Sequence, residues 1–107
     1  MNFQATYTAT KGALNTVTKN VAMRLIDTNI RCNAVAPEAA ITPAHLANKA
    51  GEQPGGDKML ELSGHFLYFP GPECEAIDQA YACLYLASKM GRCVKGQVLQ
   101  ACNGAFL

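Results

Sequence analysis

The order of the apolar segments constrains the fold of this chain more than any other feature of its sequence. Apolar residues recur with helical spacing over residues 7–27 and again over about 72–89. Each of these stretches is followed by a short strand-like segment, at 30–36 and at 95–101. A strand, a helix and another strand in this order predict a parallel pair, because parallel strands need a long crossover connection. Parallel pairs are typical of α/β sheets that helices cover on both faces.

Each predicted helix has an apolar stripe that we expect to pack against the sheet. The stripes consist of Leu14, Val17, Val21 and Leu25, widened by Ala13, Ala22 and Ile26, on the first helix, and of Ile77, Ala80, Tyr81, Leu84 and Ala87 on the second. Pro72 suits the first position of the second helix, where an N–H is not needed, and Glu73 and Glu75 complement the positive end of its dipole. Pro37 is expected to end the first strand.

Residues 38–71 are irregular in pattern and contain most of the prolines, with short helices predicted at 43–50 and 57–63. The chain of 107 residues has room for one domain. However, two strands and two helices cannot cover both faces of a parallel sheet, and strand 30–36 has a neighbour on one side only. We therefore expect the single domain 1–107 to be part of a larger fold, with apolar surface for a partner sheet.

The charge balance excludes several kinds of partner. Nine basic and eight acidic residues give a net charge of +1, which provides no field for nucleic acid or anionic lipid. No run approaches the roughly 20 apolar residues that span a bilayer, and the first residues lack the pattern of a secretion signal. We therefore expect a soluble, cytoplasmic protein that binds neither nucleic acid nor membrane.

The five cysteines are expected to be reduced thiols with structural roles. Their odd number and the lack of a C-x-x-C pair fit a reducing compartment and provide no zinc-binding spacing. Cys32 and Cys83 lie in apolar stretches, where cysteine acts as a small hydrophobe. His45 and His65 lack the neighbouring ligands that a metal site needs, so no metal is predicted.

The start of the first helix carries the strongest chemical pattern. Tyr7 and Lys11 are four residues apart, so their side chains share one face of the helix. A cation beside a phenol favours the phenolate and makes the phenol suitable for proton transfer. The same spacing also occurs in many helices as a partly buried tyrosine beside a solvated lysine. The Y-x-x-x-K pattern by itself therefore does not distinguish a catalytic pair from a structural one, and the rest of the chain has to be considered.

Three later motifs follow this pattern in a specific order. Residues 30–37 read I-R-C-N-A-V-A-P, Thr42 and Pro43 come next, and residues 96–99 read G-Q-V-L, with Gly104 near the end. Together with Tyr7 and Lys11, these motifs resemble the C-terminal part of the short-chain dehydrogenase/reductase family. The resemblance covers the chain from Tyr7 onward.

The resemblance implies a fold and a reaction. The fold would be the C-terminal portion of a doubly wound, Rossmann-type parallel sheet, here with two parallel strands, two main helices and a helical segment in a substrate loop at 38–71. Tyr7 matches the catalytic tyrosine that exchanges a proton with the substrate oxygen. Lys11 matches the catalytic lysine that assists it and binds the nicotinamide ribose. The implied cofactor is NAD or NADP, with contacts from Tyr7, Lys11, Pro37, Glu38, Ala40 and Thr42.

The sequence also departs from the family pattern. Glu38 stands where the family has a glycine, and it adds bulk and negative charge near a ligand that carries phosphates. Residues 101–104 read A-C-N-G instead of V-D-G-G. The family places its glycine-rich pyrophosphate loop and its catalytic serine upstream of the tyrosine, whereas six residues precede Tyr7 here.

We therefore expect the C-terminal fragment of an NAD(P)-dependent oxidoreductase for a small carbonyl or alcohol substrate. By itself, this fragment is expected to be inactive and to bind dinucleotide weakly or not at all. The alternative is a non-catalytic module of the same origin that self-associates or complements another chain. A homo-oligomer is expected in either case, because the bare edge of strand 30–36 favours self-association.

Three residues of the motifs also have structural interpretations that need no cofactor. Pro37 would end a strand, Thr42 would cap a helix that begins at Pro43, and Asn33 would be a buried polar residue satisfied by the backbone.

Overall fold

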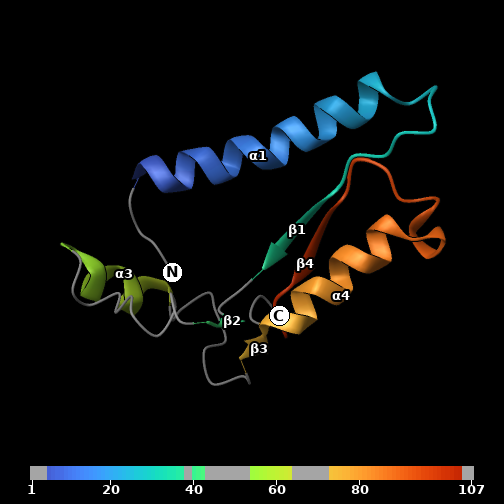
Figure 1. Ribbon diagram of the computed structural model, residues 1–107. Helices are drawn as coiled ribbons and strands as arrows, with labels where there is room; N and C mark the ends of the chain where they lie inside the picture. The colour runs from blue at the N-terminus through green and yellow to red at the C-terminus, as the bar shows by residue number, and fades with distance from the viewer. Residues whose placement is uncertain (1–4, 38–39, 43–53, 64–72, 105–107) are drawn as a thin grey trace.

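The computed structural model describes residues 5–37, 40–42, 54–63 and 73–104. The main helices are α1 (Ala5–Arg24) and α4 (Ala76–Ala87), joined in chain order by the shorter elements between them. The complete order is α1, β1 (Ala34–Pro37), β2 (Ala40–Ile41), α3 (Gly56–Ser63), β3 (Cys74–Glu75), α4, the 3₁₀ turn η2 (Lys89–Gly91) and β4 (Val98–Ala101). In Figure 1, α1 and α4 lie on opposite sides of the β1–β4 pair.

The predicted parallel pair is confirmed. β1 and β4 are parallel neighbours, with Ala34 opposite Val98 and Pro37 opposite Ala101. The helix that connects them, α4, contacts both strands from one side. The structure is therefore a partial α/β fold in which each face of a two-stranded sheet has one helix.

The first strand begins later than predicted, at Ala34, and includes Pro37 instead of ending before it. The preceding residues contact other parts of the chain through their side chains. The Arg31 guanidinium donates hydrogen bonds to the carbonyl oxygens of Leu86, Gly91 (2.7 Å), Ala87 (3.3 Å) and Ser88 (3.3 Å). Pro37 is tolerated because it is the last residue of the strand, where a missing N–H disturbs the ladder least.

The Asn33 side chain hydrogen-bonds to the backbone of the segment that precedes β4. Its Nδ2 donates to the carbonyl of Val94 at 2.8 Å, and its Oδ1 accepts from the backbone N–H of Gln97 at 3.0 Å. The interpretation of Asn33 as a polar residue satisfied by the backbone is confirmed, although its side chain is half-buried and not fully buried. β4 begins at Val98, three residues later than predicted, because Gly96 has a φ of +69° that is incompatible with a strand.

The helix predicted from about residue 72 begins at Ala76. Cys74 and Glu75 form β3 instead, paired in parallel with β2. Glu75 is the N-cap of α4 in a capping box: its side chain accepts from the backbone of Asp78, and its own N–H donates to the Asp78 carboxylate at 2.8 Å. Pro72, which we placed at the first helical position, lies outside the described residues.

The predicted helix at 57–63 is confirmed as α3, one residue longer at its start, whereas the one at 43–50 lies outside the described residues. Beside the two predicted parallel strands, β2 and β3 form a second, separate parallel pair that was not predicted from the sequence. Each of these strands has two residues, too few for an alternating pattern to be visible in the sequence. Their pairing depends on a contact between distant segments.

The apolar stripe of α4 does not face the sheet, whereas that of α1 packs inward in part: Ala22 is buried, and Val21 and Leu25 are half-buried. On α4, Ile77, Tyr81 and Leu84 are exposed, and the side that packs inward holds Leu86 with the half-buried Gln79 and Ala82. On α1, Leu14 and Val17 are exposed, whereas Thr18 and Ala22 are buried. Among the described residues, the buried hydrophobic ones are Ala22, Cys74 and Leu86. A core this small agrees with a fold whose apolar surface is meant for further contacts.

All five cysteines are free thiols, but their environments differ from the prediction. Cys74 is buried, Cys32 is half-buried and Cys83 is exposed, so Cys83 does not act as a core hydrophobe. Within the described part of the chain, no cluster of histidine, cysteine and acidic residues could hold a metal ion. No helix in that part has the length and apolar character needed to span a membrane.

Candidate functional site

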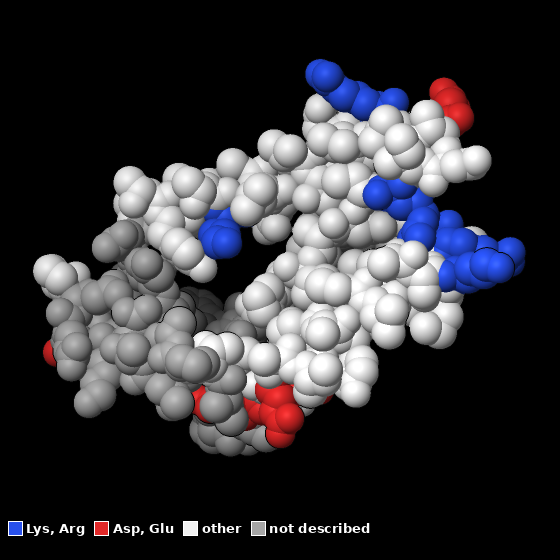
Figure 2. All heavy atoms as spheres, in the orientation of Figure 1, with Lys and Arg blue, Asp and Glu red and all other residues white. Residues whose placement is uncertain are grey.

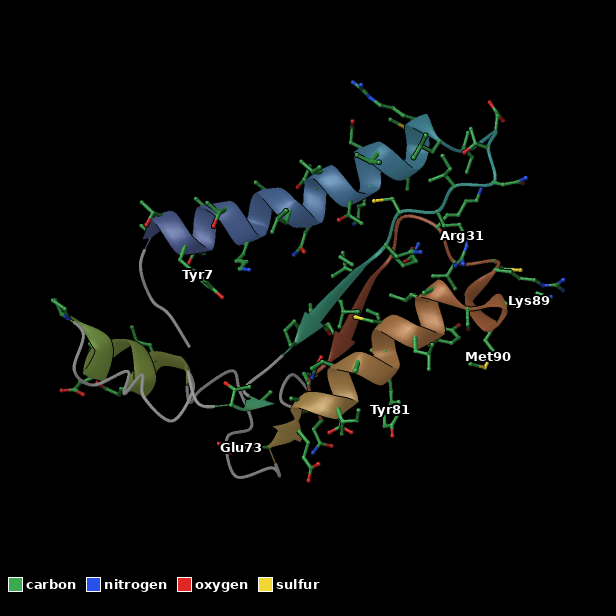
Figure 3. All side chains as sticks on the ribbon, viewed as in Figure 1. Tyr7, Arg31, Glu73, Tyr81, Lys89 and Met90 are labelled. Atoms are coloured by element: carbon green, nitrogen blue, oxygen red, sulfur yellow. The ribbon has the colours of Figure 1, made fainter. Side chains whose placement is uncertain are left out.

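Tyr7 and Lys11 lie together in the first turns of α1, as their spacing predicts. The Nζ atom of Lys11 lies 5.4 Å from the centroid of the Tyr7 ring, which is a cation–π contact. The Tyr7 side chain is 43% exposed and points away from α1 toward the side on which β1 ends (Figure 3). A phenol that remains open to solvent beside a fixed positive charge can exchange a proton with a bound substrate.

The backbone around Tyr7 has one further side-chain contact. The hydroxyl of Thr10 donates to the carbonyl oxygen of Tyr7 at 2.7 Å, within the same turn of the helix. Every residue of α1 from Ala5 to Val17 is exposed. The exposed fraction is 43% at Tyr7, 55% at Leu14 and 52% at Val17, so the described residues cover this half of α1 only in part.

The other half of α1 is attached to the start of β4. A Cβ at Gly96 would lie 3.2 Å from the Cβ of Ala22, so helix and loop approach closely at this point. The Lys95 ammonium donates to the carbonyls of Ile26 at 3.1 Å and Thr28 at 3.0 Å, just after α1 ends. These contacts secure the C-terminal end of α1 beside the first residues of β4.

This attachment sets the direction of α1. Its later turns lie beside the start of β4, and Asn15 and Thr16 share a groove with Val98 and Gln100 further along that strand. α1 therefore runs antiparallel to β4, and its first turns, with Tyr7, extend beyond the carboxyl ends of the strands. Ligands of open parallel sheets bind at that end.

The remaining predicted site residues also belong to that end of the sheet. Pro37 is the exposed last residue of β1, Ala40 is the half-buried first residue of β2, and Thr42 is half-buried directly after β2. Glu38 lies outside the described residues. The chain thus brings Pro37, Ala40 and Thr42 to the same edge to which Tyr7 and Lys11 extend.

Sequence reasoning did not assign a role to Arg31, which has four of the longest-range side-chain contacts in the described structure. It joins the segment before β1 to the last turn of α4, through the carbonyls of Leu86 and Ala87, and to the turn that follows, through those of Ser88 and Gly91. A single charged residue in an otherwise apolar, strand-like segment is the signal that could have identified it. Arg31 thus fixes the direction in which β1 reaches the site.

Two open grooves lie on the described surface, and neither includes Tyr7 or Lys11. One, of about 400 Å³, is lined by Asn15, Thr16, Lys19, Val98 and Gln100. The other, of about 440 Å³, is lined by Asn29, Arg31, Asn33, Cys83, Leu86 and Ala87.

Comparison with known proteins identifies the family of the chain. The family model for enoyl-(acyl carrier protein) reductase matches residues 1–105. The chain belongs to the short-chain dehydrogenase/reductase family. The motifs from Tyr7 onward predicted this family.

The relatives place the chain within this family. It is 58% identical over 97 residues to the short-chain dehydrogenase/reductase cdmF of Talaromyces verruculosus, covering 87% of this chain and 38% of that protein. It is 35% identical over 104 residues to the uncharacterized oxidoreductase YhxC of Bacillus subtilis, covering 94% of this chain and 33% of that protein. The chain therefore spans about a third of the length of these curated relatives.

A solved structure shows the same partial coverage. The 7α-hydroxysteroid dehydrogenase complexed with NADH and 7-oxo glycochenodeoxycholic acid is 27% identical, with a TM-score of 0.73. The match covers 98% of this chain and 39% of that one. The two parallel strands and their helices thus correspond to part of a Rossmann-type fold.

Proposed function

We propose that this chain carries the proton-transfer part of an NAD(P)-dependent oxidoreductase that interconverts a carbonyl and an alcohol. The observation that carries the proposal is the Lys11 ammonium 5.4 Å from the Tyr7 ring centroid, on helix turns that extend past the carboxyl ends of the strands. The family supports the reaction class, and the NADH in a solved relative supports the type of cofactor.

In this proposal, Tyr7 is the catalytic acid and base. Its hydroxyl donates a proton to the substrate oxygen while the carbonyl carbon gains a hydride, and the reverse transfer oxidises the alcohol. Lys11 assists this transfer from the same face of α1, where its Nζ lies 5.4 Å from the centroid of the Tyr7 ring. When bound, the nicotinamide ring supplies or accepts the hydride.

The residues present fit one end of a dinucleotide. The Lys11 ammonium and the Thr42 hydroxyl are donors suited to ribose hydroxyls and a carboxamide. Pro37, Glu38 and Ala40 would contact the nicotinamide end by their backbone. We assign the pyrophosphate-binding part to the two thirds of the relatives that this chain does not span.

Accordingly, we expect the 107 residues alone to show no saturable binding of NADH or NADPH. Fluorescence titration of both nucleotides checks this expectation. Micromolar binding by the chain alone would contradict our assignment of the pyrophosphate site. We also propose a cytoplasmic location, which the five free thiols support.

The role of Tyr7 can be tested in a chimera. Residues 1–105 replace the corresponding third of the 7α-hydroxysteroid dehydrogenase, and steroid oxidation is followed by NADH absorbance. We expect Tyr7→Phe to lower kcat by about 10²- to 10⁴-fold, because the proton donor is lost. The matched control is Tyr81→Phe on α4, which is expected to change kcat by less than about twofold. A Tyr7→Phe chimera as active as its parent would refute the proposal.

A further inference from the structure

Two cysteines lie close together beside the end of β4. The Cys74 thiol donates to the carbonyl oxygen of Ala101 at 3.7 Å, and Cys102 is the next residue of the chain. The Cα of Cys102 therefore lies within about 6.5 Å of the Cys74 sulfur, because a trans peptide places the following Cα about 2.8 Å from the carbonyl oxygen. This separation is close to the range in which disulfides form, since they join Cα atoms about 4.4–6.8 Å apart.

The other described thiols lie in different parts of the fold. Cys32 and Cys93 come before β1 and β4 begin, and Cys83 lies in the second half of α4. Because β1 and β4 are parallel, Cys32 and Cys93 belong to the amino ends of the strands. Cys74 and Cys102 lie instead at the carboxyl ends, where β3 and the end of β4 come together (Figure 1).

The two thiols differ in their access to solvent. Cys74 is 7% exposed, whereas Cys102 is half-buried. Cys102 is followed by Asn103 and Gly104, which both have positive φ angles, so the chain turns directly after it. A small oxidant therefore reaches Cys102 first. Cys74 is placed as the second thiol, which can react with Cys102 once that residue is oxidised.

The charges near the pair favour a small neutral oxidant. The exposed acidic residues Glu73, Glu75 and Asp78 lie around the start of α4, directly beside Cys74 in the chain. Figure 2 shows acidic side chains gathered apart from the basic ones, with uncharged surface between the two groups. Like charges repel an anionic oxidant such as glutathione disulfide, whereas hydrogen peroxide has no charge.

We propose that Cys74 and Cys102 are a redox-sensitive pair that hydrogen peroxide converts into a disulfide. The Cys102 sulfur attacks the peroxide, so an S–O bond forms, the O–O bond breaks, and the leaving hydroxide takes the thiol proton as water. The Cys74 sulfur then attacks the sulfur of the Cys102 sulfenic acid, so the S–S bond forms, the S–O bond breaks, and a second water leaves with the Cys74 proton. Two thiols are oxidised, and one peroxide is reduced to two waters. In a reducing compartment such a disulfide is transient, as is typical of redox sensing.

The Ala101 carbonyl keeps a hydrogen bond when Cys74 loses its thiol proton. The Nε2 of Gln79 donates to the same oxygen at 3.0 Å. Burying a carbonyl without any donor would cost free energy. The second donor allows the disulfide to form without this cost.

The disulfide fixes the β2–β3 pair to the end of β4. Cys74 is the first residue of β3, and it is paired with Ala40 of β2. Thr42 follows directly after β2. Oxidation therefore restrains the segment that we assign to the nicotinamide end. This last consequence rests on the proposed function, whereas formation of the bond does not.

Disulfide mapping of the 107-residue chain tests the pair. The reduced chain is treated with hydrogen peroxide, and its remaining thiols are alkylated. Digestion with trypsin and a protease that cleaves after glutamate then places each cysteine on a separate peptide. We expect mass spectrometry to find the peptides of Cys74 and Cys102 linked, and dithiothreitol to separate them. A digest without this link, or with links between other cysteines only, would overturn the proposal.

The order of the two steps is tested with Cys74→Ser. Cys102 then has no second thiol, so its sulfenic acid should accumulate, and its adduct with dimedone should increase at least about tenfold over the wild type. The matched control is Cys83→Ser, at an exposed thiol of α4, and it should leave both the adduct and the disulfide within about twofold. Circular dichroism checks that each variant is folded, and Cys74→Ala replaces Cys74→Ser if serine is not tolerated. An adduct that does not increase would exclude Cys74 as the second thiol.

Hydrogen exchange tests the effect of the disulfide on the fold. Oxidation should slow exchange of the backbone amides in β2 and β3 at least about fivefold, because opening of these short strands is restrained. The amides in the first half of α1 should exchange as before. Unchanged exchange in β2 and β3 would refute the restraint. None of these measurements depends on catalytic activity, so this proposal and the proposed function can fail separately.

Discussion

The two sides of the β1–β4 pair differ in how their helices are held. On one side, α4 begins in a capping box and ends on the Arg31 guanidinium, while Gln79 donates to the carbonyl of Ala101 at 3.0 Å. On the other side, the close contacts described for α1 lie near its end, through Ala22 against Gly96 and Lys95 on the carbonyls that follow the helix. The α4 side is fixed along its whole length, and the α1 side at one end.

This difference separates the stability of the chain from its proposed chemistry. Most of the residues that hold the described fold together are on or around α4, whereas Tyr7 and Lys11 are on the exposed first half of α1. A helix that is not packed along its length depends on its own marginal propensity. The position of Tyr7 relative to the strands therefore requires contacts that the described residues do not supply.

The largest expected difference between the two sides is in the cost of removing a leucine. We expect Leu86→Ala, on the buried side of α4, to lower the free energy of unfolding by about 3 kcal/mol. Leu14→Ala on α1, at a residue that is 55% exposed, should change it by less than about 0.5 kcal/mol. Urea denaturation followed by circular dichroism measures both. Equal effects would show that α1 is packed as firmly as α4.

Removing Arg31 should have the next largest effect. Arg31→Ala leaves the carbonyls at the end of α4 without their charged donor, and we expect a loss of about 2 kcal/mol. Arg24→Ala, at the exposed end of α1, is the control and should cost less than about 0.5 kcal/mol. Hydrogen exchange in the last turn of α4 should increase in the first variant and remain unchanged in the second. Unchanged exchange in both would exclude Arg31 as the main restraint on that turn.

A pair of glycine substitutions should separate the attached end of α1 from its free end. At Gly96, with a φ of +69° and Ala22 close by, alanine should cost about 1–2 kcal/mol. At Gly12, where a Cβ would meet nothing within 4 Å, alanine should stabilise the helix by up to about 1 kcal/mol. Thermal unfolding of both variants provides the comparison. A destabilising Gly12→Ala would mean that the first half of α1 is closely packed after all.

Several features of the fold could be predicted from local pattern. The two long helices, the second half of each main strand and the parallel pairing followed from periodicity and element order. The spacing of Tyr7 and Lys11 likewise predicted their contact, because residues four apart on a helix are neighbours. These features depend on residues close together in the chain or on the general rule for parallel strands.

Other features depended on contacts between distant segments. The start of β1 moved to Ala34 because the preceding residues bind the end of α4 and the approach to β4, about 60 residues away. The β2–β3 pair joins Ala40 to Cys74, and its strands are too short to have a pattern. Neither the start of β1 nor the β2–β3 pairing could be predicted from local sequence, because the residues around a hydrogen-bond donor do not indicate which distant residue accepts the bond.

By itself, the sequence determined the kinds of element, their order and the family to which the chain belongs, because period, motif and spacing are local properties. Only the tertiary structure decided which side of each helix packs inward. An apolar stripe indicates that one side of a helix packs against another surface. It does not indicate whether that surface is the sheet of the same chain or a different one. On α4 the sheet takes the side with Leu86, and the stripe with Tyr81 remains for a different contact.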